Sequence, residues 1–289
     1  MLRKDVYTLA TFTNYATLRY GGVTVTSNTV TGTLPDALTL TKTAVTEDYA
    51  PGDVVSYLLS LVNPGTTDLT GLTVTDDLGA YAFGQGTVVY PLAYTPGTLR
   101  LLVNGLPQAT PAVAPGPPLV ITGLTVPAGG TAVLAYEASL TPYAPLEAGS
   151  VITNTAAVTG LTAPITASAS VTPEVGPSLR ITKDLTPATV RADGTVTYTF
   201  TLENVGNAPA DAASAVVLED LFQPALTGLT VTGNGTPWTS GVEYTYTEGL
   251  FATLPGALTL PAATYVQAAD GTWTMTPGRT VVTVTGTIG

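Results

Sequence analysis

The chain has 289 residues, a net charge of −11 and only 10% charged residues, and it contains no histidine and no cysteine. This composition excludes a Ser-His-Asp triad, a disulfide and the usual zinc, haem and iron–sulfur ligand sets, and the acidic balance disfavours nucleic acid and anionic membranes as partners. The 56 threonines, 30 glycines and 23 prolines are typical of an all-β protein. No loop gathers an acid, a base and a nucleophile, so we expect no enzyme, no catalytic residue, no metal and no cofactor.

The start of the chain carries no recognisable export or membrane signal. Its first 22 residues contain neither an apolar segment of signal-peptide length nor a small-residue cleavage site, so no Sec signal peptide is predicted. No run of about 18 apolar residues occurs, so insertion into a membrane is not expected.

Residues 1–35 are predicted to be an N-terminal extension that forms a β-hairpin. Its strands, FTNYATL at 12–18 and VTSNTVT at 25–31, match ITNTAAV at 152–158 and ITASASVT at 165–172. Side chains alternate between the two faces of a strand, so each strand of the hairpin presents one set of residues to a partner. The predicted donor-strand residues are Phe12, Asn14, Ala16, Leu18, Val25 and Val30.

Two copies of one β-domain follow, at 36–174 and 175–289. LTLTK at 38–42 and GDVVSYLLSLVN at 52–63 recur 141 residues later as LRITK and DGTVTYTFTLEN. Apolar and polar residues alternate along the second motif, and turn sequences such as PGD, NPG and DG separate the strands. Each copy is therefore predicted to be an immunoglobulin-like sandwich of antiparallel sheets.

The two copies end differently. The first continues past AVLAYEASL into segments 152–158 and 165–172, which are predicted to form a closing hairpin. The second stops at Gly289, after TVVTVTGTI, and the hairpin that would match lies at the other end of the chain. We interpret the sequence as one period of a head-to-tail array, cut inside a domain, with an incomplete second copy.

Three arrangements of the N-terminal hairpin are open. The hairpin inserts into the second copy of a neighbouring chain, folds back onto the second copy of its own chain, or is disordered. An uncovered sandwich edge is an aggregation hazard, and the short link at 35–37 makes it hard for the hairpin to cross the whole first copy. We favour donation to a neighbour, as in donor-strand complementation, which gives a head-to-tail homopolymer.

A lysine continues the core-facing side of the first strand in each copy, and a buried ammonium is costly unless it is paired. A lysine, an asparagine and a carboxyl group can together form an isopeptide bond, because a desolvated amine attacks an amide that the carboxyl polarises. The candidate residues are Lys42, Asp76 and Asn154 within the first copy, and Lys183, Glu219 and the Asn14 of a neighbour for the second. The alternative is that both lysines form ordinary ion pairs or extend into water.

The motifs L-T-x-T-K, G-D-x-V-x-Y, V-T-D-x-L and T-N-T-A-x-V together resemble the conserved repeat domain of unknown function of bacterial and archaeal surface proteins. FTNYATL, GPPLVITGLTVPAGG and TPGRTVVTVTGTI are similar to short clostridial proteins with two such repeats. The resemblance implies an immunoglobulin-like fold and a surface role, since some relatives are reported as spore appendage components. It places the family's lysine and asparagine positions at Lys42, Asn154, Lys183 and Asn14.

We therefore expect a structural subunit of an extracellular filament on the spore or cell surface. Assembly on a spore would need no Sec export. The expected partner is a second copy of the chain, with a surface anchor protein as a further candidate. The alternative is a monomeric surface adhesin whose loops bind a ligand.

Overall fold

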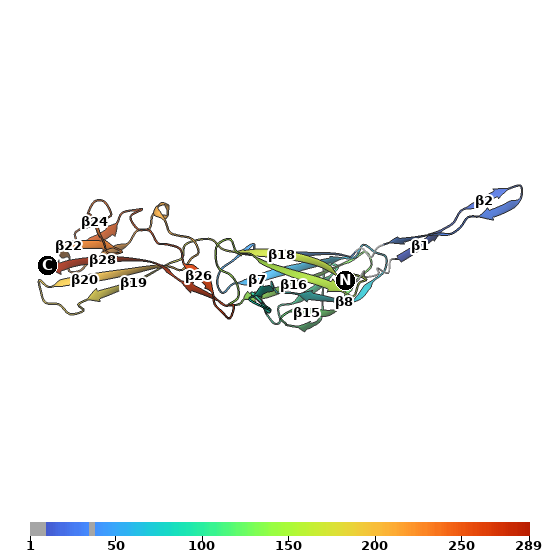
Figure 1. Cartoon of the computed structure of the whole chain (residues 1–289), viewed down its shortest axis with the longest axis horizontal. Coiled ribbons are helices and arrows are strands. Elements are labelled where there is room, and N and C mark those ends of the chain that lie inside the picture. Colours follow the sequence, from blue (N-terminus) through green and yellow to red (C-terminus); the bar gives the residue numbers. More distant parts are fainter. Residues whose placement is uncertain (1–9, 35–37) are drawn as a thin grey trace. The chain divides into compact units, whose positions relative to one another are not determined.

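The computed structural model describes residues 10–34 and 38–289, and the side chains of residues 13–32 and 38–289. The chain divides into two compact units (Figure 1). The first runs to Pro145 and includes Val151–Thr172; the second consists of Leu146–Ser150 and Pro173–Gly289. The predicted boundary between the copies, after residue 174, lies two residues further along the chain. The expected fold class is confirmed: the chain is all-β, with two tandem immunoglobulin-like sandwiches and an N-terminal hairpin.

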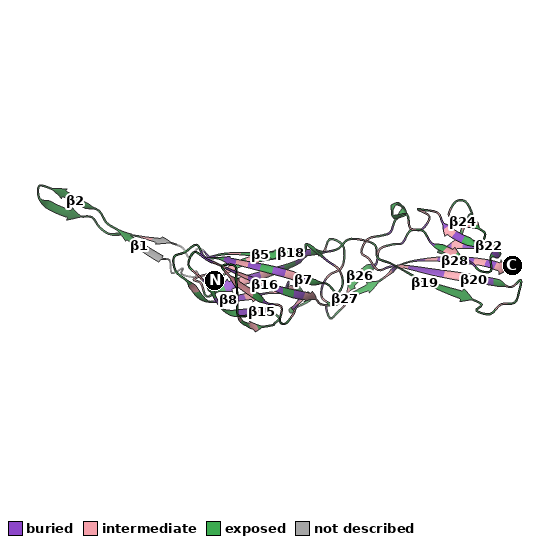
Figure 2. Cartoon of the chain, turned by 180° about the vertical axis from the view of Figure 1, so that it is seen from behind, coloured by how far each residue is buried: buried purple, intermediate pink, exposed green. Residues whose placement is uncertain are grey.

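The N-terminal hairpin consists of β1 (Ala10–Asn14), β2 (Thr17–Tyr20), β3 (Val23–Thr26) and β4 (Val30–Leu34). β1 pairs with β4 and β2 with β3, so that Asn14 lies opposite Val30 and Leu18 opposite Val25. Gly21 and Gly22 form the tip, both with positive φ, as a two-residue hairpin turn requires. Residues 13–31 are all exposed, and β2 is green in Figure 2. The backbone of Phe12 belongs to β1, and its side chain lies outside the described ones.

The first unit contains two antiparallel sheets whose inner faces form its core. One has the order β13 (Leu106–Gln108), β12 (Arg100–Val103), β16 (Thr131–Leu140), β7 (Val54–Val62) and β5 (Thr39–Ala44), with β11 (Leu92–Tyr94) also on β16. The other has the order β14 (Ala112–Ala114), β15 (Leu119–Val126), β8 (Leu69–Asp76), β17 (Ile152–Thr159), β18 (Ile165–Pro173) and β6 (Asp48–Tyr49). β9 (Tyr81–Phe83) and β10 (Thr87–Val89) form a separate hairpin.

The predicted alternation is visible on β7, where Val55, Tyr57, Leu59 and Leu61 are buried. The residues between them are exposed or half-buried, because a strand that packs on one face leaves alternate side chains near solvent.

The second unit has a five-stranded sheet and a smaller one. The larger has the order β19 (Leu179–Thr186), β20 (Thr195–Asn204), β28 (Gly278–Ile288), β22 (Leu226–Gly233) and β23 (Thr236–Trp238). The smaller has the order β21 (Glu219–Leu221), β25 (Leu250–Thr253) and β24 (Tyr244–Thr247). β26 (Thr264–Gln267) pairs with β27 (Trp273–Thr276), and η1 (Ala212–Ser214) is a single 3₁₀ turn capped by Asp211. Within the described residues, no helix is long and apolar enough to cross a membrane.

The internal repeat corresponds to equivalent strands. Leu40 faces Leu61 across β5 and β7, and Ile181 faces Leu202 across β19 and β20, 141 residues further on in both strands. The environments differ: all eight residues of β19 are exposed, whereas Leu38 and Lys42 of the matching segment are buried. Leu179 is 43% exposed and Leu38 only 5%. The second unit therefore leaves uncovered a strand that the first unit covers.

Candidate functional site

A buried ion pair joins the two sheets of the first unit. Lys42 on β5 reaches across the core, and its Nζ lies 2.6 Å from Oδ2 of Asp76 at the end of β8. Both side chains are completely excluded from solvent. The sequence predicted both residues to face inward, and the structure brings them together.

The carboxylate of Asp76 is held by three donors. Besides Lys42, the hydroxyl of Tyr136 on β16 donates to Oδ2 at 2.5 Å, and the backbone N–H of Leu78 donates to Oδ1 at 3.0 Å. Tyr136 did not stand out in the sequence. Its only signal was its place in the inward-facing alternation of AVLAYEASL, opposite Tyr57.

Asn154 on β17 completes the cluster. Its side-chain nitrogen lies 3.4 Å from the hydroxyl of Tyr136, and its side-chain oxygen is buried without a hydrogen-bond partner. β17 lies beside β8, with Ala156 opposite Asp76, so the closing hairpin itself delivers this amide to the core. The structure thus gathers Lys42, Asp76 and Asn154, the three residues predicted for the first copy.

Aromatic rings enclose the lysine. The Lys42 ammonium lies 4.9 Å from the ring centroid of Tyr57, and the rings of Tyr57 and Tyr136 stack with centroids 5.6 Å apart. Tyr94 packs against Tyr136 from another side, at 6.3 Å. The rings keep water away and leave Lys42 few positions other than the one beside Asp76.

Burial governs the protonation of this cluster. Burial lowers the pKa of Lys42, and the neighbouring Asp76 and Asp77 only partly oppose that effect. Burial also raises the pKa of Tyr136 well above its ordinary value, with the negative charge of Asp76 acting in the same direction. Lys42 can therefore lose its proton more readily than an exposed lysine, and Tyr136 stays a hydroxyl.

This arrangement contains the parts of an amide exchange. A deprotonated lysine is a nucleophile, the side-chain amide of asparagine is an acyl donor, and a carboxyl group can supply and accept protons. In the first unit all three are shielded from water, which is the competing nucleophile. Whether the bond forms is a question of chemistry that we take up as a proposal.

The second unit has an incomplete version of the cluster. Lys183 on β19 forms an ion pair with Asp220, and its ammonium lies 4.6 Å from the ring of Tyr198 and 5.5 Å from those of Phe200 and Phe222. The Lys183 side chain is 41% exposed, against 0% for Lys42. Asn14, the predicted amide partner, lies in the N-terminal hairpin opposite Val30 and is exposed.

The carboxylate predicted for this site, Glu219, is not the one that contacts Lys183. Glu219 is exposed, and its neighbour Asp220 lies on the same face as the buried Leu218 and Phe222. The connection that precedes β21 contains η1 and two more residues than its counterpart, and the sequence comparison placed that insertion one residue off. A shift of one residue exchanges the two faces of a strand.

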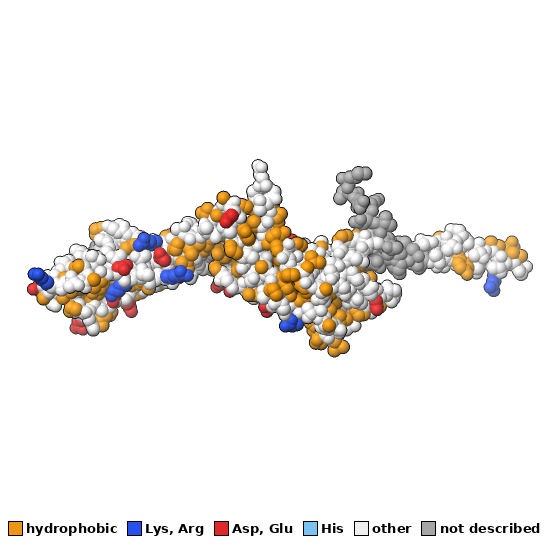
Figure 3. Space-filling view, turned by 90° about the horizontal axis from the view of Figure 1, so that it is seen from below, with side chains coloured by type: hydrophobic (Ala, Val, Ile, Leu, Met, Phe, Trp, Pro, Cys, Tyr) orange, Lys and Arg blue, Asp and Glu red, His pale blue; other side chains and the backbone are white. Residues whose placement is uncertain are grey.

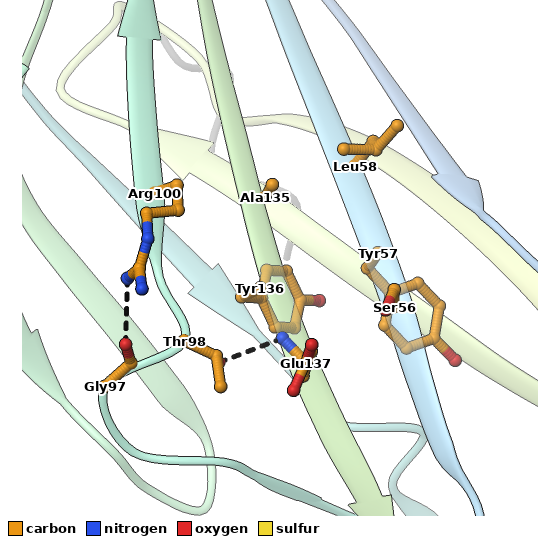
Figure 4. Close-up of a pocket in the computed structure, with 9 residues that line it drawn as sticks. All are labelled: Ser56, Tyr57, Leu58, Gly97, Thr98, Arg100, Ala135, Tyr136 and Glu137. Atoms are coloured by element: carbon orange, nitrogen blue, oxygen red, sulfur yellow. Dashed lines mark hydrogen bonds between the residues drawn. The ribbon is translucent and has the colours of Figure 1, made fainter. Parts of the chain in front are cut away.

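A separate hollow of about 310 Å³ lies on the first unit, where β7, β12 and β16 run side by side (Figure 4). Arg100 and Glu137 contribute its charged side chains. The guanidinium of Arg100 donates to the carbonyl oxygens of Gly97 and Leu99. The sequence gave no reason to expect a site here. Among the described residues, no group of three or more acidic side chains is placed to hold a metal ion.

No family model matches the chain, and the search of curated proteins finds no match. Solved structures with similar folds include domains D2 and D3 of the major pilin SpaD from Corynebacterium diphtheriae, at 16% identity over 82% of this chain and 88% of that one, with a TM-score of 0.35. A C-terminal fragment of the major pilin GBS80 of Streptococcus agalactiae has 14% identity over 84% and 91%, with a TM-score of 0.34. The collagen-binding subdomain of the Enterococcus faecalis surface protein ACE has 10% identity over 45% and 94%, with a TM-score of 0.30.

Proposed function

We propose that the chain is the structural subunit of an extracellular filament, in which the N-terminal hairpin of one copy completes the second unit of the next. The observation that carries this proposal is the difference between the two copies of the repeat. In the first unit, β8 has β15 on one side and β17 on the other. In the second unit, β21 carries Asp220 as β8 carries Asp76, yet among the described strands it pairs only with β25.

The N-terminal hairpin has the sequence that the open edge lacks. Its segment FTNYATL matches ITNTAAV of β17, whose Ile152, Asn154, Ala156 and Val158 all point into the core of the first unit. In the hairpin, the matching Leu18 is 65% exposed. An apolar hairpin without a core and an open core without a hairpin, on one chain, favour strand addition between copies.

The exposed surface agrees with this proposal. Charged side chains are sparse on the face shown in Figure 3, where hydrophobic and uncharged polar side chains dominate. In the second unit the apolar residues of β19 and β21, Leu179, Ile181, Leu185 and Leu221, are 39–54% exposed. An inserted hairpin would cover apolar side chains next to β21, which is the usual source of stability at a permanent interface.

The lysine clusters give the filament a means of covalent locking. We include in the proposal an isopeptide bond between Lys42 and Asn154 within each copy. A second bond would join Lys183 to the Asn14 that a neighbouring copy inserts beside Asp220. Each bond releases one ammonia and so lowers the mass by about 17 Da; the bland alternative is two ordinary ion pairs.

The experiment that tests assembly compares the full chain with a variant lacking residues 1–34, by size-exclusion chromatography and negative-stain electron microscopy. We expect fibres or a ladder of oligomers from the full chain and none from the truncated variant. Adding a peptide of residues 1–34 should block assembly of the full chain by capping its open edge. Fibres from the truncated variant, or a full chain that stays a 29.4 kDa monomer, would overturn the proposal.

A location outside the cell, on the spore or cell surface, and a separate anchor protein at the base of the filament remain part of the proposal. The alternative function is a monomeric surface adhesin. The hollow beside Arg100 and Glu137 is the observation that favours it, because it joins a cationic and an anionic group at a concave surface. Substituting both residues with alanine should leave assembly unchanged and abolish surface attachment only if the adhesin function is correct.

A further inference from the structure

Tyr136 is the one described side chain that hydrogen-bonds both Asp76 and Asn154. Its hydroxyl is 2.5 Å from Asp76 Oδ2 and 3.4 Å from the side-chain nitrogen of Asn154. No described hydrogen bond joins Asp76 to Asn154 directly. If the carboxyl group is to polarise the amide, the hydroxyl of Tyr136 is the group that lies between them.

The amide of Asn154 has an unmet requirement at this point. Its side-chain oxygen is buried without a donor, while its nitrogen faces the hydroxyl of Tyr136. A half-turn of the amide about its Cβ–Cγ bond exchanges the two atoms and presents the oxygen to the hydroxyl. A buried carbonyl oxygen without a donor is costly, so this orientation is favoured as soon as Tyr136 has a proton to give.

We propose that Tyr136 is a catalytic residue of the Lys42–Asn154 bond, relaying a proton from Asp76 to the amide oxygen of Asn154. This inference rests on the isopeptide bond of the proposed function and adds to it a fourth residue. The hydroxyl accepts a proton from the Asp76 carboxyl and donates its own to the oxygen on which negative charge develops. It therefore acts as the donor of an oxyanion site.

The step balances as follows. Lys42 reacts as a neutral amine while the shared proton of the pair resides on Asp76. The lone pair of Nζ forms a bond to Cγ of Asn154, the carbonyl electron pair moves to the oxygen, and that oxygen takes a proton from Asp76 through Tyr136. Asp76 then takes a proton from Nζ and passes it to the amide nitrogen, and the C–N bond breaks to release ammonia. The oxygen returns its proton through Tyr136 to Asp76 as the carbonyl re-forms.

The surroundings hold the relay in place. The ring of Tyr136 stacks on Tyr57 with an interplanar angle of 25°, and Tyr94 packs against it, so the hydroxyl has one position. The second oxygen of Asp76 is held by the N–H of Leu78, which leaves Oδ2 facing both Lys42 and Tyr136. Burial lowers the pKa of Lys42, and this favours the neutral amine that the step requires.

The test uses the full chain with three sequences: unaltered, Tyr136→Phe and Tyr57→Phe. Tyr57→Phe is the matched control, because Tyr57 is stacked on Tyr136 and equally buried, yet no hydrogen bond of its hydroxyl to Asp76 is described. Freshly made protein is digested with trypsin at successive times. A bond at Lys42 blocks cleavage there and links peptide 20–100 to peptide 101–180, with a loss of about 17 Da.

We expect the linked peptides in the unaltered chain and in Tyr57→Phe, and a rate at least about 100-fold lower in Tyr136→Phe, the usual cost of removing one oxyanion donor. Circular dichroism of the Tyr136→Phe variant should match that of the unaltered chain. Linkage at an unaltered rate in Tyr136→Phe would overturn the relay and leave the bond standing. An equal slowing in Tyr57→Phe would reduce Tyr136 to a packing residue and also overturn the relay. An unaltered chain that stays unlinked would overturn the bond itself.

Discussion

Tyr198 and Val284 lie opposite each other on β20 and β28, in the positions that Tyr57 and Tyr136 occupy on β7 and β16. Phe222 stacks on Tyr198 instead, with ring centroids 4.7 Å apart. The lysine site of the second unit therefore has an aromatic cage without the hydroxyl that bridges carboxylate and amide in the first.

This difference predicts two rates of bond formation. The bond between Lys42 and Asn154 should form first, and a bond between Lys183 and the Asn14 of a neighbour at least about tenfold more slowly, because no phenol donates to its amide oxygen. Intact mass reports the first bond, and the ladder that survives boiling in SDS reports the second. Lys183→Arg is the control: it keeps the charge and removes the nucleophile, so its fibres should boil down to monomers. Faster cross-chain linkage would contradict the prediction.

Removing one lysine should have very different costs in the two units. Lys42→Met leaves the fully buried carboxylate of Asp76 uncompensated, and we expect the free energy of unfolding of the first unit to fall by about 3–5 kcal/mol. Lys183→Met breaks a partly exposed pair and should cost about 1 kcal/mol or less. Both tryptophans, Trp238 and Trp273, belong to the second unit. Tryptophan fluorescence in urea therefore follows that unit alone, and tyrosine circular dichroism adds the first.

In the Lys42→Met variant, the fluorescence transition should stay at its unaltered urea concentration while the tyrosine signal moves to a lower one. A fluorescence transition that moved as far would show that the effect is not confined to the first unit. The double variant Lys42→Met, Asp76→Leu should regain much of the lost stability, because no charge is left buried.

The first unit should lose stability above pH 10. Burial raises the pKa of Tyr49, Tyr57 and Tyr136 in the folded state, so above the ordinary value of 10.0 the unfolded chain releases protons that the folded one keeps. In an unlinked chain, Lys42 has the opposite effect at lower pH. Its folded pKa is lowered below 10.5, so stability should rise with pH in the window below that value. Tyrosinate absorbance should show a subset of tyrosines that ionise only when the first unit unfolds.

The inward face of the hairpin should decide assembly. Leu18→Asp would bury an unpaired carboxylate in the acceptor, at a cost of several kcal/mol, so fibres should fail to form. Leu18 is exposed in the hairpin, so the monomer should stay folded. Thr17→Asp, one residue earlier and on the other face, is the matched control and should assemble normally. Fibres from Leu18→Asp together with failure of Thr17→Asp would show that the opposite face enters the acceptor.

The sequence predicted the architecture because the architecture is repeated in it. The 141-residue spacing that relates Leu40 to Ile181 and Leu61 to Leu202 is kept in the strand pairing, and the inward phase of Lys42, Asp76 and Asn154 follows from simple alternation. Alternation counts along one strand, so it can show that several residues face a core. It cannot show which residues of opposite sheets meet there.

The two failures at the site have that origin. Asp220 was missed because an insertion before β21 displaced the count by one residue, and a strand of three residues is too short to restore it. Tyr136 was missed because a tyrosine in a β-sandwich strand is ordinarily a packing residue. Its role depends on two hydrogen bonds to the other sheet, which no local pattern records.

The open side of β21 also has a consequence for the polarity of a filament. If each incoming copy fills one such edge, it brings an identical open edge of its own, so every addition recreates the end that it consumed. Growth of this kind has a direction and no built-in length. One end always displays a free hairpin and the other a vacant groove, so two different proteins would be needed to start and to stop it. The amount of subunit available would set how long each filament becomes.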